Sequence, residues 1–239
     1  MLSVVMPAHN EADYIQGAVA AVVEGLRQRG IAFEVVVVEN GSVDATAARV
    51  ALLAERYPEV VSVALEVADY GHALRAGFMA SRGALVANFD VDLVDLDFAD
   101  HALKLIEQED AAIVVGSKRS PGSTDRRSLG RRLVTAVFSL VLRAGFGLLV
   151  SDTHGMKLLR RQALVGLVAD CCFGGDIFDT ELILRAERAG LTVTEVPVTV
   201  ADQRPPRTSI LTRIPRSMAG LARLWLSLRR DETGAPSGL

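Results

Sequence analysis

Short apolar runs, rich in β-branched residues, alternate along the chain with segments whose apolar residues repeat at helical spacing. The runs, which predict strands, are residues 2–6, 33–38, 60–66, 84–89 and 111–116. The segments between them, which predict helices, are residues 12–28, 44–56, 71–82 and 97–109. Strands that are apolar on both faces and separated by helices indicate an α/β fold, with a mainly parallel sheet flanked by helices.

The second half of the chain is less regular. A basic loop at 117–128 precedes an apolar helix at about 130–147, and short strands are predicted at "GMKLL" and "TVTEVPV". Two further helices are expected at 161–168 and 177–189. We expect one domain over residues 1–210, a C-terminal amphipathic helix over 211–230 and a disordered tail over 231–239.

Polar segments follow three of the predicted strands: "PAHNE", "ENGS" and "DVD". Ligands of open parallel sheets bind beyond the carboxyl ends of the strands, so we expect these segments to meet at one edge. Pro7, Ala8, Asn10 and Glu11 are expected to form a turn that opens a helix and faces a base and ribose. The Glu39 carboxylate can accept the imide hydrogen of uracil or two donors of guanine.

Four aspartates fall within "NFDVDLVDLD", residues 88–97. One interpretation is an acidic turn followed by a helix cap. The other is a divalent cation held by Asp90 and Asp92 against a phosphate, with Asp95 and Asp97 serving the turn and the cap.

Six segments together resemble a known family: "VVMPAHNEADYI", "VVVVENGSVDAT", "YGHALRAGFMASRG", "NFDVDL", "SDTHGMKLLRRQAL" and "FDTELILRAERAGLTVTEVPV". Their order and spacing are similar to family 2 glycosyltransferases of the GT-A fold. The most similar branch is that of the polyprenyl-phosphate and dolichyl-phosphate mannose or glucose synthases. The resemblance covers about residues 1–210.

The resemblance implies an inverting transfer of a hexose from a nucleotide-diphosphate sugar (UDP, GDP or dTDP) with Mg²⁺ or Mn²⁺. Asp90 and Asp92, flanking Val91, match the metal-binding Asp-x-Asp, and Asp92 is also a catalytic candidate. Further residues implied around the donor are Pro7, Ala8, Asn10, Glu11, Glu39, Gly71, Arg75, Lys118, His154, Arg204 and Arg207. Asp152 of "SDTHG" is a further catalytic candidate, implied to orient the acceptor or the donor sugar.

The acceptor is left open between a polyprenyl phosphate and a small molecule with a hydroxyl group. Asp179 matches the position of the catalytic base in relatives that act on hydroxyls. A phosphate monoester has a second pKa of about 6 and needs no base, so with that acceptor Asp179 would only position substrate.

Three positions depart from the family pattern. "ENGS" replaces the common "DDGS", Val94 stands where a glutamine assists the metal, and Ser209 occupies a lysine position. These changes motivate a minor alternative, a non-catalytic nucleotide-sugar-binding regulatory protein. A dinucleotide-dependent dehydrogenase is disfavoured because no Gly-x-Gly-x-x-Gly follows the first strand.

Charge and targeting features bear on location more than on chemistry. The 239 residues carry a net charge of −3, and no signal peptide precedes the first strand, so we expect a cytoplasmic protein without a nucleic-acid partner. Arginines flank apolar helical segments at 130–147 and 210–230, which leaves open a peripheral contact with the inner membrane face, docking on the domain, or a homodimer.

Overall fold

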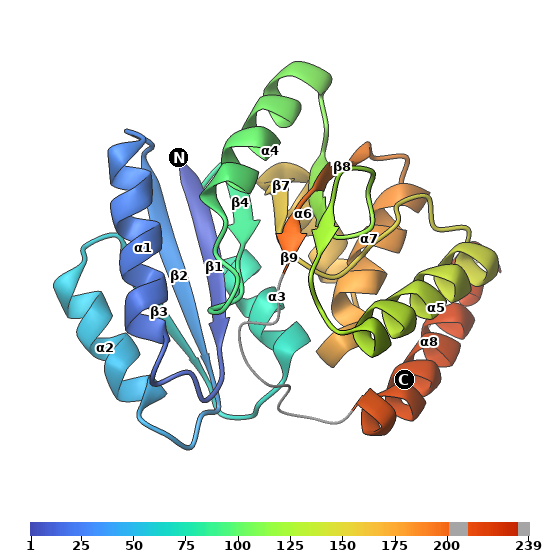
Figure 1. Ribbon diagram of the computed structural model, residues 1–239, viewed down its shortest axis with the longest axis horizontal. Helices are drawn as coiled ribbons and strands as arrows, with labels where there is room; N and C mark the ends of the chain where they lie inside the picture. The colour runs from blue at the N-terminus through green and yellow to red at the C-terminus, as the bar shows by residue number, and fades with distance from the viewer. Residues whose placement is uncertain (201–209, 234–239) are drawn as a thin grey trace.

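The structure of the chain is a computed structural model, which describes residues 1–200 and 210–233 (Figure 1). Its strands are β1 (Leu2–Ala8), β2 (Phe33–Asn40), β3 (Val60–Leu65), β4 (Leu85–Asn88), β5 (Ile113–Ser117), β6 (Thr124–Asp125), β7 (Lys157–Arg160), β8 (Val193–Pro197) and β9 (Thr199–Val200). Its α-helices are α1 (Ile15–Gln28), α2 (Thr46–Arg56), α3 (Tyr70–Ala80), α4 (Leu96–Glu109), α5 (Leu129–Phe146), α6 (Arg161–Asp170), α7 (Phe178–Arg188) and α8 (Ile210–Thr233). A short 3₁₀ helix, η1 (Gly175–Ile177), precedes α7.

The central sheet has seven strands in the order β3-β2-β1-β4-β7-β5-β8. All neighbours are parallel except β7, which runs antiparallel to both β4 and β5. The expected α/β fold with a mainly parallel sheet is therefore confirmed. Because β7 is reversed, its first residue, Lys157, pairs with Asn88 near the end of β4 and with Val115 near the end of β5. The segment before β7 thus arrives at the edge where the parallel strands end.

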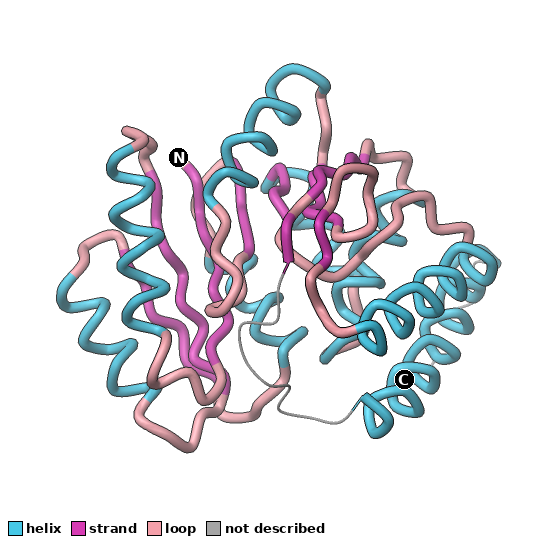
Figure 2. The backbone as a smooth tube through the Cα atoms, in the orientation of Figure 1, coloured by secondary structure: helices cyan, strands magenta, loops and turns pink. Residues whose placement is uncertain are grey.

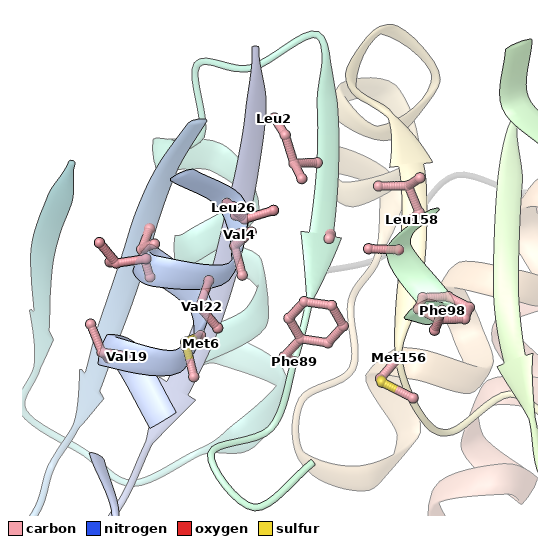
Figure 3. Packing of buried hydrophobic residues seen from close by; sticks show 14 of the residues in the cluster. Leu2, Val4, Met6, Val19, Val22, Leu26, Phe89, Phe98, Met156 and Leu158 are labelled. Atoms are coloured by element: carbon pink, nitrogen blue, oxygen red, sulfur yellow. The ribbon is translucent and has the colours of Figure 1, made fainter. Parts of the chain in front are cut away.

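Helices cover both faces of the sheet. One apolar cluster joins the sheet to α1, α2 and α4, and Figure 3 shows Val19, Val22 and Leu26 of α1 packed toward Val4 and Met6. The other cluster joins the opposite face to α3, α6 and α7. Apolar residues on both faces of β1, β2 and β5 explain this layering, since each face of a buried strand needs a helical cover.

Helix α8 packs on the second cluster. Leu221, Leu224 and Leu228 are buried there, and a Cβ on Gly220 would lie 2.6 Å from Ile177 Cγ1, so glycine permits this close approach. The helix extends to Thr233, beyond the expected end at 230, and the rest of the expected tail, 234–239, lies outside the described residues. None of the described helices has the length and apolar content needed to cross a bilayer.

The loops that follow β1, β2 and β4 gather at the lower edge of the sheet in the view of Figure 2. Register supports this placement: Ala8 pairs with Glu39, and Val5 pairs with Asn88. The three polar segments singled out in the sequence therefore lie at one edge, as expected from parallel topology.

Candidate active site

Hydrogen bonds tie the turns after β1 and β2 into one unit. His9 Nδ1 lies 2.8 Å from the Asn40 carbonyl oxygen, and Asn10 accepts from the Val43 amide at 2.9 Å. Asn10 has a φ of 54°, a left-handed conformation that asparagine tolerates better than most residues. Glu39 is 7% exposed and accepts from the Ser42 amide at 2.6 Å. The Glu39 carboxylate is therefore held at the end of β2, at the edge where a nucleoside base is expected.

Pro7 and Ala8 do not belong to the turn that the sequence predicts, because both are buried residues of β1 and the helix begins only at Ile15. The Val5 carbonyl accepts from the Phe89 amide and so faces the chain that continues β4; Pro7, two residues later, directs its nitrogen to that same side. The pairing between β1 and β4 ends at Val5 and Asn88, before Pro7 is reached. A proline is tolerated because no ladder bond needs its missing N–H.

Asp90 and Asp92 lie in the turn between β4 and α4, and both are half-buried. The Tyr70 hydroxyl donates to Asp90 Oδ1 at 2.9 Å. Burial, with the nearby charges of Asp92 and Asp179, raises the pKa of Asp90 to about 6, although the Tyr70 hydrogen bond and Lys157 oppose this shift. Burial and the charges of Asp90 and Asp179 also raise the pKa of Tyr70, which keeps its hydroxyl a donor.

The rest of the acidic run is confirmed as a helix start. Asp95 is the N-cap of α4 and accepts from the Phe98 amide at 2.9 Å. Asp97 lies in the first turn of α4 and pairs with Arg29 at 3.3 Å. Val91 is buried in the first apolar cluster, so only its backbone remains for a donor contact.

Asp179 forms a buried ion pair. Lys157 Nζ lies 2.8 Å from Asp179 Oδ1, and the two side chains are 0% and 2% exposed. The ammonium also donates to the Gly155 carbonyl at 2.9 Å. One Asp179 oxygen is therefore occupied by a cation, which favours a positioning role for this carboxylate.

Asp152 lies in the segment that leads into β7. It is 4% exposed, and its Oδ2 pairs with Lys118 Nζ at 3.0 Å, at the end of β5. Lys118 also donates to the His154 carbonyl at 3.0 Å. Glu195 Oε1 accepts from the amides of Ser151 and Asp152, at 2.9 and 3.2 Å. The Asp152 loop is thus held from β5 on one side and from β8 on the other.

A third loop, which precedes α7, packs over the start of α3. Asp69, the N-cap of α3, accepts from the Gly175 amide at 2.8 Å. A Cβ on Gly71 would lie 2.7 Å from Phe178 Cβ, so glycine is needed for this contact. Arg75 donates to the Cys171 carbonyl at 2.9 Å, which shows it holding this loop.

A cavity of about 440 Å³ adjoins the Asp152 loop. Its apolar wall comes from α5 and α8 and includes Val134, Val137, Phe138, Val141, Leu142 and Met218. Its polar lining includes Lys118, Arg127, Arg131, Asp152, His154 and Asp176. The cavity therefore joins an apolar space to three basic residues and to the residues of the site.

A divalent cation fits the Asp90 and Asp92 pair. Burial is the largest cause of the raised pKa of Asp90, and the nearby carboxylates of Asp92 and Asp179 raise it further against the opposing charge of Lys157. A bound cation would offset this repulsion between carboxylates. Within the described residues, no group of three or more His, Cys, Asp or Glu side chains is placed to hold a metal by itself. A cation bound here would need further oxygen ligands, such as the phosphates of a nucleotide.

Comparison with known proteins assigns the family. The chain matches the sequence profile described as "Glycosyl transferase family 2" over residues 3–167. The chain belongs to glycosyltransferase family 2. It is therefore an enzyme of the glycosyltransferase class, as the resemblance of its motifs implied.

Three relatives give the range of similarity within the family. Glycosyltransferase AglD of Haloferax volcanii is 29% identical over 95% of this chain and 37% of its own length. Dolichyl-phosphate beta-glucosyltransferase ALG5A of Trichomonas vaginalis is 27% identical over 82% of this chain and 64% of its own length. An uncharacterised glycosyltransferase of Mycobacterium tuberculosis is 31% identical over 92% of each chain. This chain thus spans about a third of the length of AglD and about two thirds of the length of ALG5A.

Solved structures confirm the fold. Glucosyl-3-phosphoglycerate synthase from M. tuberculosis, in complex with Mn²⁺, UDP and glucosyl-3-phosphoglycerate, matches with a TM-score of 0.66 and 20% identity, over 100% of this chain and 81% of that one. The same synthase with phosphoglyceric acid matches with a TM-score of 0.67 and 24% identity, over 95% and 79%. The GT-A fold of this family 2 chain is therefore shown.

The edge of the sheet brings together most of the residues that the sequence predicted. Around it lie Asn10, Glu11, Glu39, Gly71, Asp90, Asp92, Lys118, Asp152, His154 and Asp179. Arg204 and Arg207 fall outside the described residues, as does Ser209. Sequence reasoning missed Tyr70, Lys157 and Glu195, although each lies inside a quoted motif, because motif spacing does not say which carboxylate a donor reaches.

Proposed function

We propose that this family 2 glycosyltransferase moves glucose from UDP-glucose to a polyprenyl phosphate, with inversion at the sugar carbon. The observation that carries the proposal is the cavity between α5 and α8. Its apolar wall suits an isoprenoid chain, and Lys118, Arg127 and Arg131 suit a phosphate head group. A small polar acceptor would leave the apolar wall without a partner.

Lys118, Arg127 and Arg131 are the Lys and Arg side chains that line the cavity. Arg127 forms a bidentate pair with Asp125, at 2.9 and 2.7 Å, and Lys118 pairs with Asp152. Arg131, on the first turn of α5, is half-buried at the cavity. Arginine binds a phosphate through two parallel hydrogen bonds, so we assign Arg131 the main contact with the acceptor.

The state of Asp179 supports a phosphate acceptor. General base catalysis requires a carboxylate that reaches the hydroxyl proton of the acceptor. Asp179 is 2% exposed, and one of its oxygens already accepts from Lys157. An acceptor phosphate is largely ionised near neutral pH, since its second pKa is about 6, and it needs no base.

The choice of donor rests on Glu39 and on the relatives. A buried carboxylate at the end of β2 can accept the single imide hydrogen of uracil. The similar synthase from M. tuberculosis has been solved in complex with UDP, and two of the similar glycosyltransferases are named for dolichyl phosphate and glucose. UDP-glucose agrees with all three observations.

The reaction is a single displacement. An acceptor phosphate oxygen forms a bond to the anomeric carbon while the bond from that carbon to the UDP oxygen breaks, and the electron pair leaves with UDP. Lys118 and Arg131 hold the acceptor phosphate, and Asp152 fixes Lys118. A divalent cation at Asp90 and Asp92 would offset the charge that grows on the leaving diphosphate.

The test compares two acceptors with UDP-glucose and Mn²⁺: a short-chain isoprenyl phosphate that dissolves in water, and the alcohol of the same chain. We expect UDP release with the phosphate only. Arg131→Gln should raise KM for the isoprenyl phosphate at least tenfold and leave KM for UDP-glucose unchanged, because it removes one charged hydrogen-bonding group of about 1.5–3 kcal/mol.

Arg143→Gln is the matched control, since Arg143 is exposed on the last turn of the same helix, away from the cavity. It should leave both constants unchanged. Turnover of the alcohol, or an Arg131 variant that behaves as the wild type with the phosphate, would overturn the proposed acceptor.

A further inference from the structure

The two amphipathic helices of the chain differ in what covers their apolar residues. In α8, Leu221, Leu224 and Leu228 are buried on the domain. In α5, Leu129, Leu133, Val137 and Leu140 are 79%, 66%, 53% and 66% exposed. Figure 1 shows the two helices at the same end of the molecule. Sequence alone left both helices open to a membrane contact, to docking on the domain or to a homodimer, and the structure separates them.

The exposed apolar residues of α5 form one stripe. Leu129, Leu133, Val137 and Leu140 follow one another at intervals of four, four and three residues, so they lie on one side of the helix. Leu149, just beyond the helix, is 75% exposed. Single exposed leucines are common on protein surfaces, but a contiguous row is typical of an interaction site.

The charges around the stripe identify the kind of partner. The sequence of α5 contains no acidic residue and three arginines. Arg132 and Arg143 are exposed and stand eleven residues apart, about three turns, so they line one flank of the stripe. An apolar row beside arginines matches a bilayer surface, where acyl chains lie beneath anionic head groups.

The stripe is also continuous with the cavity. Leu133 and Val137 belong to both the exposed row and the cavity lining. An isoprenoid chain in a bilayer could thus pass along α5 into the cavity without crossing water. A second copy of the chain would also cover the apolar row, but it would bring the arginines of two α5 helices together.

We propose that α5, and not α8, is the surface through which this enzyme binds anionic lipid bilayers, with Leu129, Leu133, Val137 and Leu140 entering the interface. This inference rests on the proposed polyprenyl-phosphate acceptor for its purpose. Its test does not depend on turnover.

The experiment measures sedimentation of the full chain with vesicles of phosphatidylcholine, alone or mixed with phosphatidylglycerol. We expect binding to the mixed vesicles that weakens with added salt. Leu129→Gln/Leu140→Gln, which leaves the cavity lining intact, should bind at least tenfold more weakly, about 1.4 kcal/mol. Leu52→Gln/Leu226→Gln removes two leucines that are 56% and 50% exposed on α2 and α8, and should bind as the wild type does.

The same samples are assayed with UDP-glucose and the short isoprenyl phosphate in the absence of vesicles. If the α5 variant loses vesicle binding and no sample turns over the isoprenyl phosphate, the proposed acceptor is contradicted but the proposed membrane surface is supported. Equal vesicle binding by the α5 and control variants would overturn the surface. So would a wild-type dimer that the α5 variant converts to a monomer.

Discussion

The buried pair of Lys157 and Asp179 gives the sharpest test of the site. Asp179→Asn keeps the shape of the side chain but removes its charge, which leaves the Lys157 ammonium 0% exposed and without its anionic partner. Removing one partner of a buried pair typically costs about 3–5 kcal/mol. For a domain of this size each kcal/mol lowers Tm by about 2–4 °C, so we expect a fall of about 6–20 °C.

Catalysis should respond much less than stability. With a phosphate acceptor, Asp179 only positions its neighbours, and kcat at a temperature well below Tm should fall by less than about tenfold. A catalytic base would instead lose about two to four powers of ten. Differential scanning fluorimetry and initial rates of UDP release measure the two effects on one preparation.

A double-mutant cycle supplies the control. Lys157→Met should destabilise the chain by a similar amount, because it leaves the Asp179 carboxylate buried and uncompensated. Asp179→Asn/Lys157→Met should recover much of the loss, since neither charge remains. A large fall in kcat for Asp179→Asn with little change in Tm would refute the positioning role and favour a hydroxyl acceptor.

Three further predictions concern the donor site, a close packing contact and pH. UDP with Mn²⁺ at about 100 times Kd should stabilise the chain by about 2.7 kcal/mol, or about 5–11 °C in Tm. Asp92→Asn should abolish this rise in Tm. An unchanged rise in the variant would mean that the donor binds elsewhere. Gly71→Ala should lower the free energy of unfolding by about 1–3 kcal/mol, because its Cβ would lie 2.7 Å from Phe178 Cβ. Gly17→Ala is the control and should not destabilise the chain, since there is open space around Gly17. Equal losses of stability for the two variants in urea unfolding would contradict the contact. Burial opposes ionisation of Glu34, but hydrogen bonds from Ser3 and Arg82 outweigh it and lower its pKa, so its contribution to stability is present above its ordinary pKa of 4.5 and lost as pH falls. Glu34→Gln should therefore destabilise the chain near pH 7 and progressively less below pH 4.5. A difference in unfolding free energy between variant and wild type that stays constant across that pH range would contradict the shift.

The sequence determined the layered sheet and the edge that carries the site. Every strand from β1 to β5 was predicted within a few residues, because continuous apolar runs between helical segments leave few other arrangements. Parallel topology then placed Glu39, Asp90 and Asp92 at one edge, and local rules of helix capping located Asp95.

Tertiary structure decided which side chains meet at that edge. Only the reversed direction of β7 brings Lys157 to Asp179, and only the packing of the loop before α7 turns Arg75 to the Cys171 carbonyl. Each contact joins residues far apart in the chain, and motif spacing carries no information about their distance in space.

The same limit applies to the two amphipathic helices. The pattern of α5 and of α8 predicts an apolar face for each, but that pattern is local and does not name what covers the face. The domain buries Leu221, Leu224 and Leu228 of α8, with Gly220 against Ile177, and leaves Leu129, Leu133 and Leu140 of α5 exposed beside the cavity. Packing between distant elements made that choice, because the contacts that bury Leu142 of α5 and the three leucines of α8 in the second cluster join residues far apart in the chain.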